Sequence, residues 1–122
     1  MTIRGIRGAT TIQADEPEQV LAATYELLQA ILAANPGLET ADIASAVFTV
    51  TEDIASAYPA LAARRMGWDL VPMVCTREIP VPGSLALCIR ALIHWNTDRE
   101  QAAIHHVYLH AAVSLRPDLA NA

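Results

Sequence analysis

One long stretch of helical periodicity limits what this chain of 122 residues can fold into. In residues 17–34, apolar side chains recur at the three- and four-residue intervals of a single helix face. Asp15 is a candidate N-cap, Pro17 suits the first turn, and the run 35–37 (Asn-Pro-Gly) ends the pattern. The other periodic segments are shorter, so the fold must be built around this helix.

Segments rich in β-branched and apolar residues surround the helix and predict strands. Their ranges are 2–11, 43–50, 70–76, 91–96 and 106–115. Gly5 and Gly8 indicate close backbone approach or a bulge in the first strand. Pro72 indicates an edge or bulge in the third, and the last strand should end at Arg116-Pro117.

Shorter helical or turn-forming segments lie between these strands. They are a turn capped by Thr40, an Ala-rich helix over 52–66 that Pro59 interrupts and Gly67 ends, a helix capped by Ser84 that runs to Ile89, and the polar segment 98–103. Residues 80–83 should form a stiff loop.

The order of these elements predicts one α/β (α+β) domain over residues 1–122, with a mixed five-stranded sheet, one long helix and short helices. One long helix covers one face of such a sheet and leaves the other short of cover. We therefore expect the chain to form an oligomer through the second face.

The composition excludes several classes of protein. With 53% hydrophobic and 17% charged residues, the chain is not disordered. Its net charge of −5 argues against binding to nucleic acid or to an anionic membrane. All eight basic residues are arginines, so Schiff-base or general-base lysine chemistry is excluded.

The segments that would indicate export or membrane insertion are missing from the sequence. No signal-like apolar segment precedes the first strand, and no apolar run reaches the ~18 residues of a spanning helix. Cys75 and Cys88 are expected to be free thiols. We expect a soluble, cytoplasmic protein.

Familiar catalytic motifs such as the P-loop and the nucleophile elbow do not occur. The four histidines (His94, His105, His106 and His110) are not joined by a plausible set of further ligands, so no metal is expected. Gly5-Ile6-Arg7-Gly8 has the GXXG spacing of KH domains, but it lies in a β-prone segment of an acidic chain.

Arg90 is the most informative charged residue, because it lies in the apolar stretch SLALCIRALIHW. A partly buried guanidinium there needs a carboxylate, either from the protein or from a ligand. Glu78 is the natural candidate. A purely structural Glu78–Arg90 ion pair and a role in a ligand site both remain open.

Other arginines could converge with Arg90 on a small anion with more than one carboxylate. These are Arg7, Arg64, Arg65 and Arg116. Tyr58 and Tyr108 could supply an apolar wall and a hydroxyl donor, or could belong to the core.

Four segments together resemble one family. IRGIRGATT, VPMVCTRE, CIRALIHWNTD and HVYLHAAVSLRPDL resemble the AroH class of chorismate mutase, in order and over nearly the whole chain. The resemblance implies a homotrimer with a pseudo-α/β-barrel arrangement and active sites between subunits. It implies the Claisen rearrangement of chorismate to prephenate, on the route to phenylalanine and tyrosine, without metal or cofactor.

The resemblance also implies roles for individual residues. Arg7 and Tyr108 would bind the carboxylate of the enolpyruvyl side chain, and Arg90 would contact the ether oxygen of the breaking bond. Glu78 and Cys75 would hold the ring hydroxyl. The catalytic set is therefore Arg7, Cys75, Glu78 and Arg90.

The remaining members of the implied substrate-binding set are Tyr58, Arg64, Val74, Thr76, Arg77, Leu115 and Arg116. Tyr58 would pack on the ligand, residues 74–78 would line the cleft, and Leu115 and Arg116 would close it. Leu61 stands where a relative carries lysine, so Arg64 or Arg65 would have to supply that charge.

Two alternatives belong to other functional classes. One is an enamine/imine deaminase of the YjgF-like trimer group, which has a similar architecture but lacks the HVYL and LRPDL segments. The other is a non-catalytic trimer that binds small anions.

Overall fold

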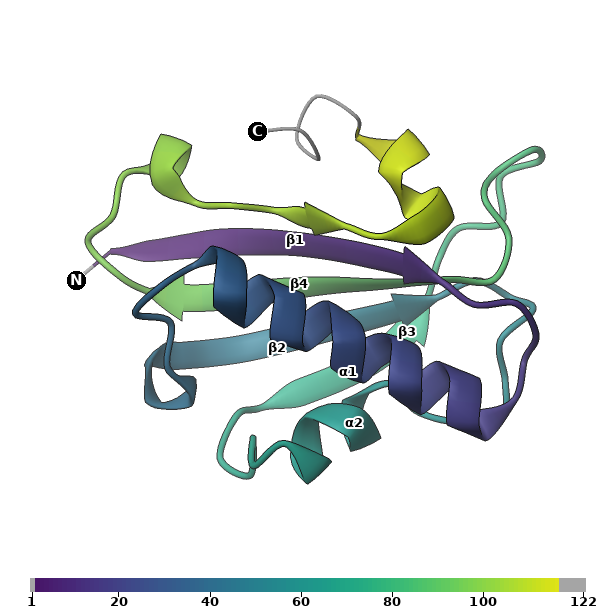
Figure 1. The fold of residues 1–122 in the computed structure, drawn as a ribbon, viewed down its shortest axis with the longest axis horizontal. Helices are drawn as coiled ribbons and strands as arrows, with labels where there is room; N and C mark the ends of the chain where they lie inside the picture. The colour runs from purple at the N-terminus through teal and green to yellow at the C-terminus, as the bar shows by residue number, and fades with distance from the viewer. Residues whose placement is uncertain (1, 117–122) are drawn as a thin grey trace.

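The computed structural model describes residues 2–116, which form a five-stranded sheet with one long helix laid across a face (Figure 1). The strands are β1 (Ile3–Thr11), β2 (Ile43–Val50), β3 (Met73–Arg77), β4 (Cys88–Asn96) and β5 (Val107–Tyr108). The helices are α1 (Pro17–Ala34) and α2 (Ala60–Arg65), with 3-10 turns η1 (Thr40–Asp42), η2 (Gln101–Ala103) and η3 (His110–Leu115).

The strands lie in the order β3-β2-β4-β1-β5. β4 runs antiparallel to both β1 and β2, whereas β3 pairs with β2 and β5 pairs with β1 in parallel. The prediction of a mixed five-stranded sheet is confirmed. Pro72 directly precedes β3, which is an edge strand as its sequence indicated.

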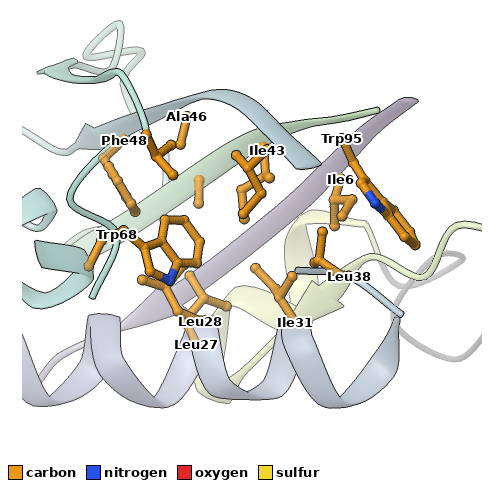
Figure 2. Packing of buried hydrophobic residues seen from close by; sticks show 14 of the residues in the cluster. Ile6, Leu27, Leu28, Ile31, Leu38, Ile43, Ala46, Phe48, Trp68 and Trp95 are labelled. Carbon is orange, nitrogen blue, oxygen red and sulfur yellow. The ribbon is translucent and has the colours of Figure 1, made fainter. Parts of the chain in front are cut away.

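The main core lies between α1 and the sheet (Figure 2). Leu27, Leu28 and Ile31 of α1 meet fully buried sheet residues such as Ile6 and Phe48. Gly8 permits this close packing, because a Cβ atom there would lie 2.7 Å from Cδ1 of Ile31. The expected close approach is therefore confirmed at Gly8.

Strand alternation sends successive side chains of each strand to opposite faces of the sheet. Ile89, Ala91 and Ile93 of β4 are buried, and Ala91 and Ile93 belong to the core beneath α1. The alternate residues Arg90 and Leu92 point to the opposite face. There Arg90 pairs with Ala9 and Thr49, while Leu92 pairs with Arg7 and Val47.

The second face is only partly covered within residues 2–116. η3 packs over one end of it, where Ala112 joins Ala9, Cys88 and Tyr108 in a small cluster. Towards β3, Leu92 is 38% exposed and Val74 is 59% exposed. The expected shortage of cover is therefore present in the single chain.

The predicted helix over 52–66 is wrong in its first half, because only Ala60–Arg65 is helical. The loop that precedes α2 is held by a side chain from a distant part of the sequence. The Asp15 carboxylate accepts hydrogen bonds from the backbone of Ala55 and Ser56, at 2.9 and 3.1 Å. Asp15 is thus not the N-cap of α1, a position that Glu16 occupies.

The predicted helix from Ser84 to Ile89 is also wrong. Leu87 has a φ of 50° and β4 begins at Cys88. The Asp53 carboxylate accepts the Leu87 backbone N–H at 3.0 Å, so the chain turns directly into the strand.

Two of the predicted strands, over 70–76 and 106–115, begin too early or run too long. β3 begins at Met73 rather than Leu70, and β5 contains only Val107–Tyr108 before η3 begins at His110. His110 has a φ of 54°, which breaks the extended backbone. Of the predicted Arg116-Pro117 terminus, Pro117 lies outside the described residues.

Candidate active site

A cavity of about 350 Å³ lies on the face of the sheet that α1 leaves open. It brings together four of the sequence-predicted site residues, which come from separate parts of the chain: Arg7 of β1, Glu78 after β3, Arg90 of β4 and Tyr108 of β5. Its remaining lining is Gly8, Ala9, Val47, Thr49, Ala91 and Leu92.

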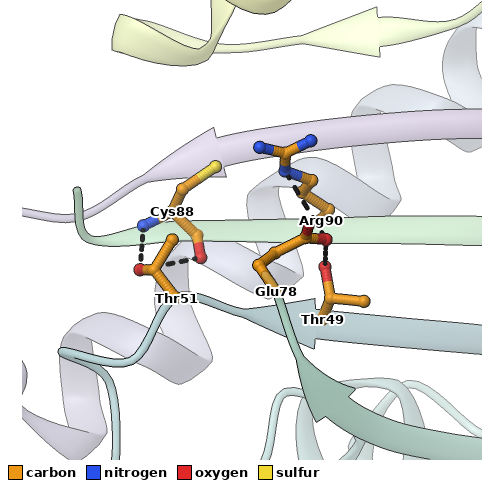
Figure 3. Close-up of polar contacts among 5 residues, drawn as sticks. All are labelled: Thr49, Thr51, Glu78, Cys88 and Arg90. Atoms are coloured by element: carbon orange, nitrogen blue, oxygen red, sulfur yellow. Dashed lines mark hydrogen bonds and ion pairs between the residues drawn. The ribbon is translucent and has the colours of Figure 1, made fainter. Parts of the chain in front are cut away.

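Glu78 and Arg90 form the predicted ion pair inside this cavity, with Arg90 Nε 3.7 Å from Glu78 Oε2 (Figure 3). Both side chains are about one quarter exposed, at 27% and 26%. The Thr49 hydroxyl donates a hydrogen bond to the same Oε2 atom. The Glu78 backbone N–H donates to Val50 at 3.0 Å, so the carboxylate is fixed through both its main chain and its side chain.

Thr49 was missed by the sequence reasoning. Its position opposite Arg90 in the β2–β4 register brings it to Glu78, and only the strand pairing reveals that. A lone threonine in an apolar strand carries no such signal.

Two donors beside the cavity make no hydrogen bond within residues 2–116, although one of them, Arg90 Nε, faces the Glu78 carboxylate. Arg90 Nε and Tyr108 Oη are buried and make no hydrogen bond within residues 2–116. A buried polar group left unpaired costs about 1–3 kcal/mol. Arg7 and Arg90 line the cavity, so a ligand with oxygen acceptors and negative charge would suit it.

Cys88 lies beside Arg90, in the same row of the sheet face (Figure 3). Burial raises the pKa of the Cys88 thiol, although Arg90 acts in the opposite direction. The Cys88 backbone is locked to Thr51, whose hydroxyl accepts the Cys88 N–H at 3.0 Å. Cys88 therefore contributes a neutral thiol rather than a nucleophilic thiolate.

A second cavity, of about 320 Å³, contains three more predicted residues: Tyr58, Arg64 and Cys75. Cys75 pairs with Phe48 and packs against the core beneath α1, which places it on the other face of the sheet from Arg90. Leu61 lies in this cavity too. Within one chain, the structure does not bring this group together with Arg90.

The remaining predicted residues are placed as follows. Thr76 and Arg77 line a third cavity with Tyr58 and Cys75. The Arg77 guanidinium donates to the carbonyls of Thr51 and Ile54, so it fixes the loop before α2. Val74 is exposed, Leu115 packs against the Tyr108 cluster, and Arg116 is the last described residue.

The described part of the chain offers neither a cluster of metal ligands nor a membrane-spanning helix. In residues 2–116, no three His, Cys, Asp or Glu side chains gather as metal ligands would. No helix in that range has the length and hydropathy to span a bilayer.

The fold and the cavity define a small α/β protein whose open sheet face gathers two arginines, a glutamate and a tyrosine around one cavity. The family model of chorismate mutase type I matches residues 3–119. The chain belongs to this family, and it is accordingly an isomerase that converts chorismate to prephenate in aromatic amino-acid biosynthesis. The resemblance noted in the sequence is thereby confirmed.

Individual relatives agree with the family. The chain is 52% identical to the chorismate mutase AroH of Thermus thermophilus over 120 residues, which is 98% of each chain. It is 42% identical to the chorismate mutase AroH of Bacillus subtilis, over 98% of this chain and 94% of that one. A solved chorismate mutase from Clostridium thermocellum superposes with a TM-score of 0.87 at 47% identity, and covers 90% of this chain and 97% of its own.

Proposed function

We propose that the cavity around Arg90 is the half of the active site that holds the reacting bond. Arg7 and Tyr108 bind the carboxylate of the enolpyruvyl side chain, Glu78 accepts the ring hydroxyl, and Arg90 faces the ether oxygen. The single observation that carries this proposal is the cavity that brings Arg7, Glu78, Arg90 and Tyr108 together from separate parts of the chain.

The chemistry explains why a fixed cation suffices. The rearrangement is unimolecular: the ether C–O bond breaks while a C–C bond forms, and negative charge grows on the departing oxygen. No nucleophile, acid or base is required, and neither is a cofactor. The protein must fold the flexible side chain over the ring and stabilise the growing charge.

Arg90 meets the second need because its position is set before substrate arrives. It lies on β4, paired on both sides, and Glu78 holds its guanidinium from one side. Thr49 in turn holds Glu78. Removal of one such preorganised donor costs about 3–4 kcal/mol of transition-state stabilisation.

We further propose that the second half of each site comes from a neighbouring copy in a homotrimer. Tyr58, Arg64 and Cys75 line a separate cavity near the β3 edge, and Val74 and Thr76 flank Cys75 on the same strand. The exposed apolar side chains of Leu92 and Val74 on the uncovered sheet face support burial against another subunit. In this assembly Arg64 supplies the charge that Leu61 does not, and Leu115 and Arg116 close the cleft.

Arg77 has a narrower place in the proposal. Because its guanidinium already bonds two loop carbonyls, it lines the cleft without reaching the substrate. The whole chain, residues 1–122, acts as one domain, and the enzyme is located in the cytoplasm.

The test is a direct assay. Purified protein is mixed with chorismate, and loss of the substrate's ultraviolet absorbance is followed, while light scattering gives the mass of the assembly. Turnover by a trimer, abolished in Arg90→Ala without change of mass, supports the proposal. A trimer that binds chorismate without converting it would support the non-catalytic alternative instead.

A further inference from the structure

The side chain of His106 accepts a backbone hydrogen bond from β1 that a neighbouring strand would otherwise accept. The backbone N–H of Arg7 donates to His106 Nδ1 at 2.9 Å. The pairing of β1 with β5 begins only at Gly8 and Val107, so the ladder supplies no carbonyl for Arg7. The imidazole nitrogen accepts this hydrogen bond where a further strand residue would otherwise do so.

The same short segment holds Tyr108. Tyr108 pairs with Ala9, and the backbone N–H of Leu109 donates to the Ala9 carbonyl at 2.9 Å. His106 is therefore joined to Arg7 on one side and, through β5, to Tyr108 on the other. These are the two residues that the proposed function assigns to one carboxylate.

We propose that His106 is a positioning residue, which in its neutral form holds β1 so that Arg7 and Tyr108 meet the same substrate carboxylate. This inference rests on the proposed role of Arg7. A ring nitrogen that accepts a hydrogen bond carries no proton, so the imidazole must be the neutral tautomer with its hydrogen on Nε2.

The surroundings favour that neutral form. Burial lowers the pKa of His106, and three neighbouring groups that can carry positive charge lower it further: Arg7 from β1, Arg116 after η3, and His105 beside it. Protonation at acid pH would turn Nδ1 into a donor that faces the Arg7 N–H. It would also add a cation next to Arg7 and Arg116. Positioning is therefore complete above the usual histidine range and is lost as pH falls below it.

The experiment compares kcat and KM between about pH 5 and 8 for three variants. In His106→Asn, Oδ1 lies at the same number of bonds from the main chain as Nδ1 and cannot be protonated in this range. His106→Leu removes the acceptor. His105→Gln is the matched control, because the His105 side chain is exposed and only its backbone is bonded, to Asn35.

The wild-type enzyme should show a KM that rises about tenfold towards the acid end, with a much smaller change in kcat. His105→Gln should keep this rise, moved slightly to higher pH, because it removes one charge that lowers the pKa of His106. The Asn variant should keep a low, flat KM, and the Leu variant should show a raised KM at every pH. If His106 had a merely structural role, His106→Asn would not change the rise of KM at acid pH. Circular dichroism verifies that the variants remain folded.

Two results would overturn the inference: an acid limb that persists in His106→Asn, or a normal KM in His106→Leu. Arg7→Gln separates this from the proposed function. If Arg7→Gln leaves KM unchanged, the role of Arg7 fails; if it raises KM while the His106 variants do not, only the positioning role fails.

Discussion

Glu78 and Arg90 meet at 3.7 Å on the open face of the sheet, and Thr49 donates to the same carboxylate oxygen that faces Arg90 Nε. The pair thus satisfies only part of the guanidinium. Arg90 Nε faces this oxygen from beyond hydrogen-bond distance and makes no hydrogen bond within residues 2–116. This incomplete pairing fits a cation held ready for a substrate oxygen.

Arg90→Ala should lower kcat by at least about 100-fold, because a preorganised donor to the breaking bond is lost. Arg90→Lys should recover only part of this, since an ammonium lacks the planar fork. Initial rates at saturating chorismate measure both. Arg4→Ala, which alters a β1 arginine bonded to the Arg99 carbonyl outside the cavity, is the control. Near-normal turnover in Arg90→Ala would refute the role.

Thr49→Val should reduce kcat about tenfold with little effect on folding, because it removes one hydrogen bond to the Glu78 carboxylate and conserves volume. Thr49→Ser keeps the hydroxyl and should stay near the wild-type rate. Stopped assays at saturating substrate distinguish the two variants. Equal loss in both would mean that packing, not the hydrogen bond, matters at this position.

Turnover at saturating substrate should be nearly flat between about pH 6 and 9, since the reaction needs no titrating acid or base. Because burial raises the pKa of Cys88, its thiol stays protonated further into the alkaline range and adds no negative charge beside Arg90. A kcat profile across buffers tests this. A bell-shaped curve would indicate a different mechanism.

Mixed trimers should restore activity if each site draws on two chains. Arg90→Ala and Arg64→Ala alter residues in different cavities. When the two inactive variants are refolded together in equal amounts, about one quarter of the sites should contain two intact halves. The recovered rate, compared with separately refolded variants, measures this. No recovery would place Arg64 and Arg90 in the same chain's site.

Gly8→Ala should destabilise the protein by about 1–3 kcal/mol, because the added methyl overpacks the core. Its Cβ would lie 2.7 Å from Cδ1 of Ile31 and 3.2 Å from Cδ1 of Leu27. Gly5→Ala is the matched control on the same strand, where the nearest atom, Leu92 Cδ1, lies at 3.6 Å. Urea midpoints at one protein concentration compare them. Equal midpoints would show that α1 shifts freely to make room.

Local sequence was sufficient where one element decides its own limits. Residues 17–34 are helical as expected, with Pro17 at the start and Asn35 at the end, and the strand over 43–50 is also as expected. The prediction of a helix over the loop before α2 was wrong, because two distant side chains, Asp15 and Arg77, form hydrogen bonds with the loop backbone. No local propensity contains that information.

The contacts of the candidate site were likewise predictable from the sequence only in part. The apolar context of Arg90 called for a carboxylate, and Glu78, which follows a predicted strand, was the candidate; this ion pair is confirmed. Thr49 and His106 escaped notice because their contacts, to Glu78 and to the Arg7 backbone, depend on register and on where β5 begins. Two-residue alternation predicts a face, but pairing across strands requires the fold.

The alternation on β4 has one further consequence for work with the enzyme. A slip of that strand by one residue would turn Arg90 towards α1 and Ile89 and Ile93 towards solvent. The same register therefore sets both the apolar packing and the aim of the guanidinium. A chain that folds in the wrong register loses stability and function together, so the fraction of active sites in a preparation should report directly on the fraction of correctly paired sheets.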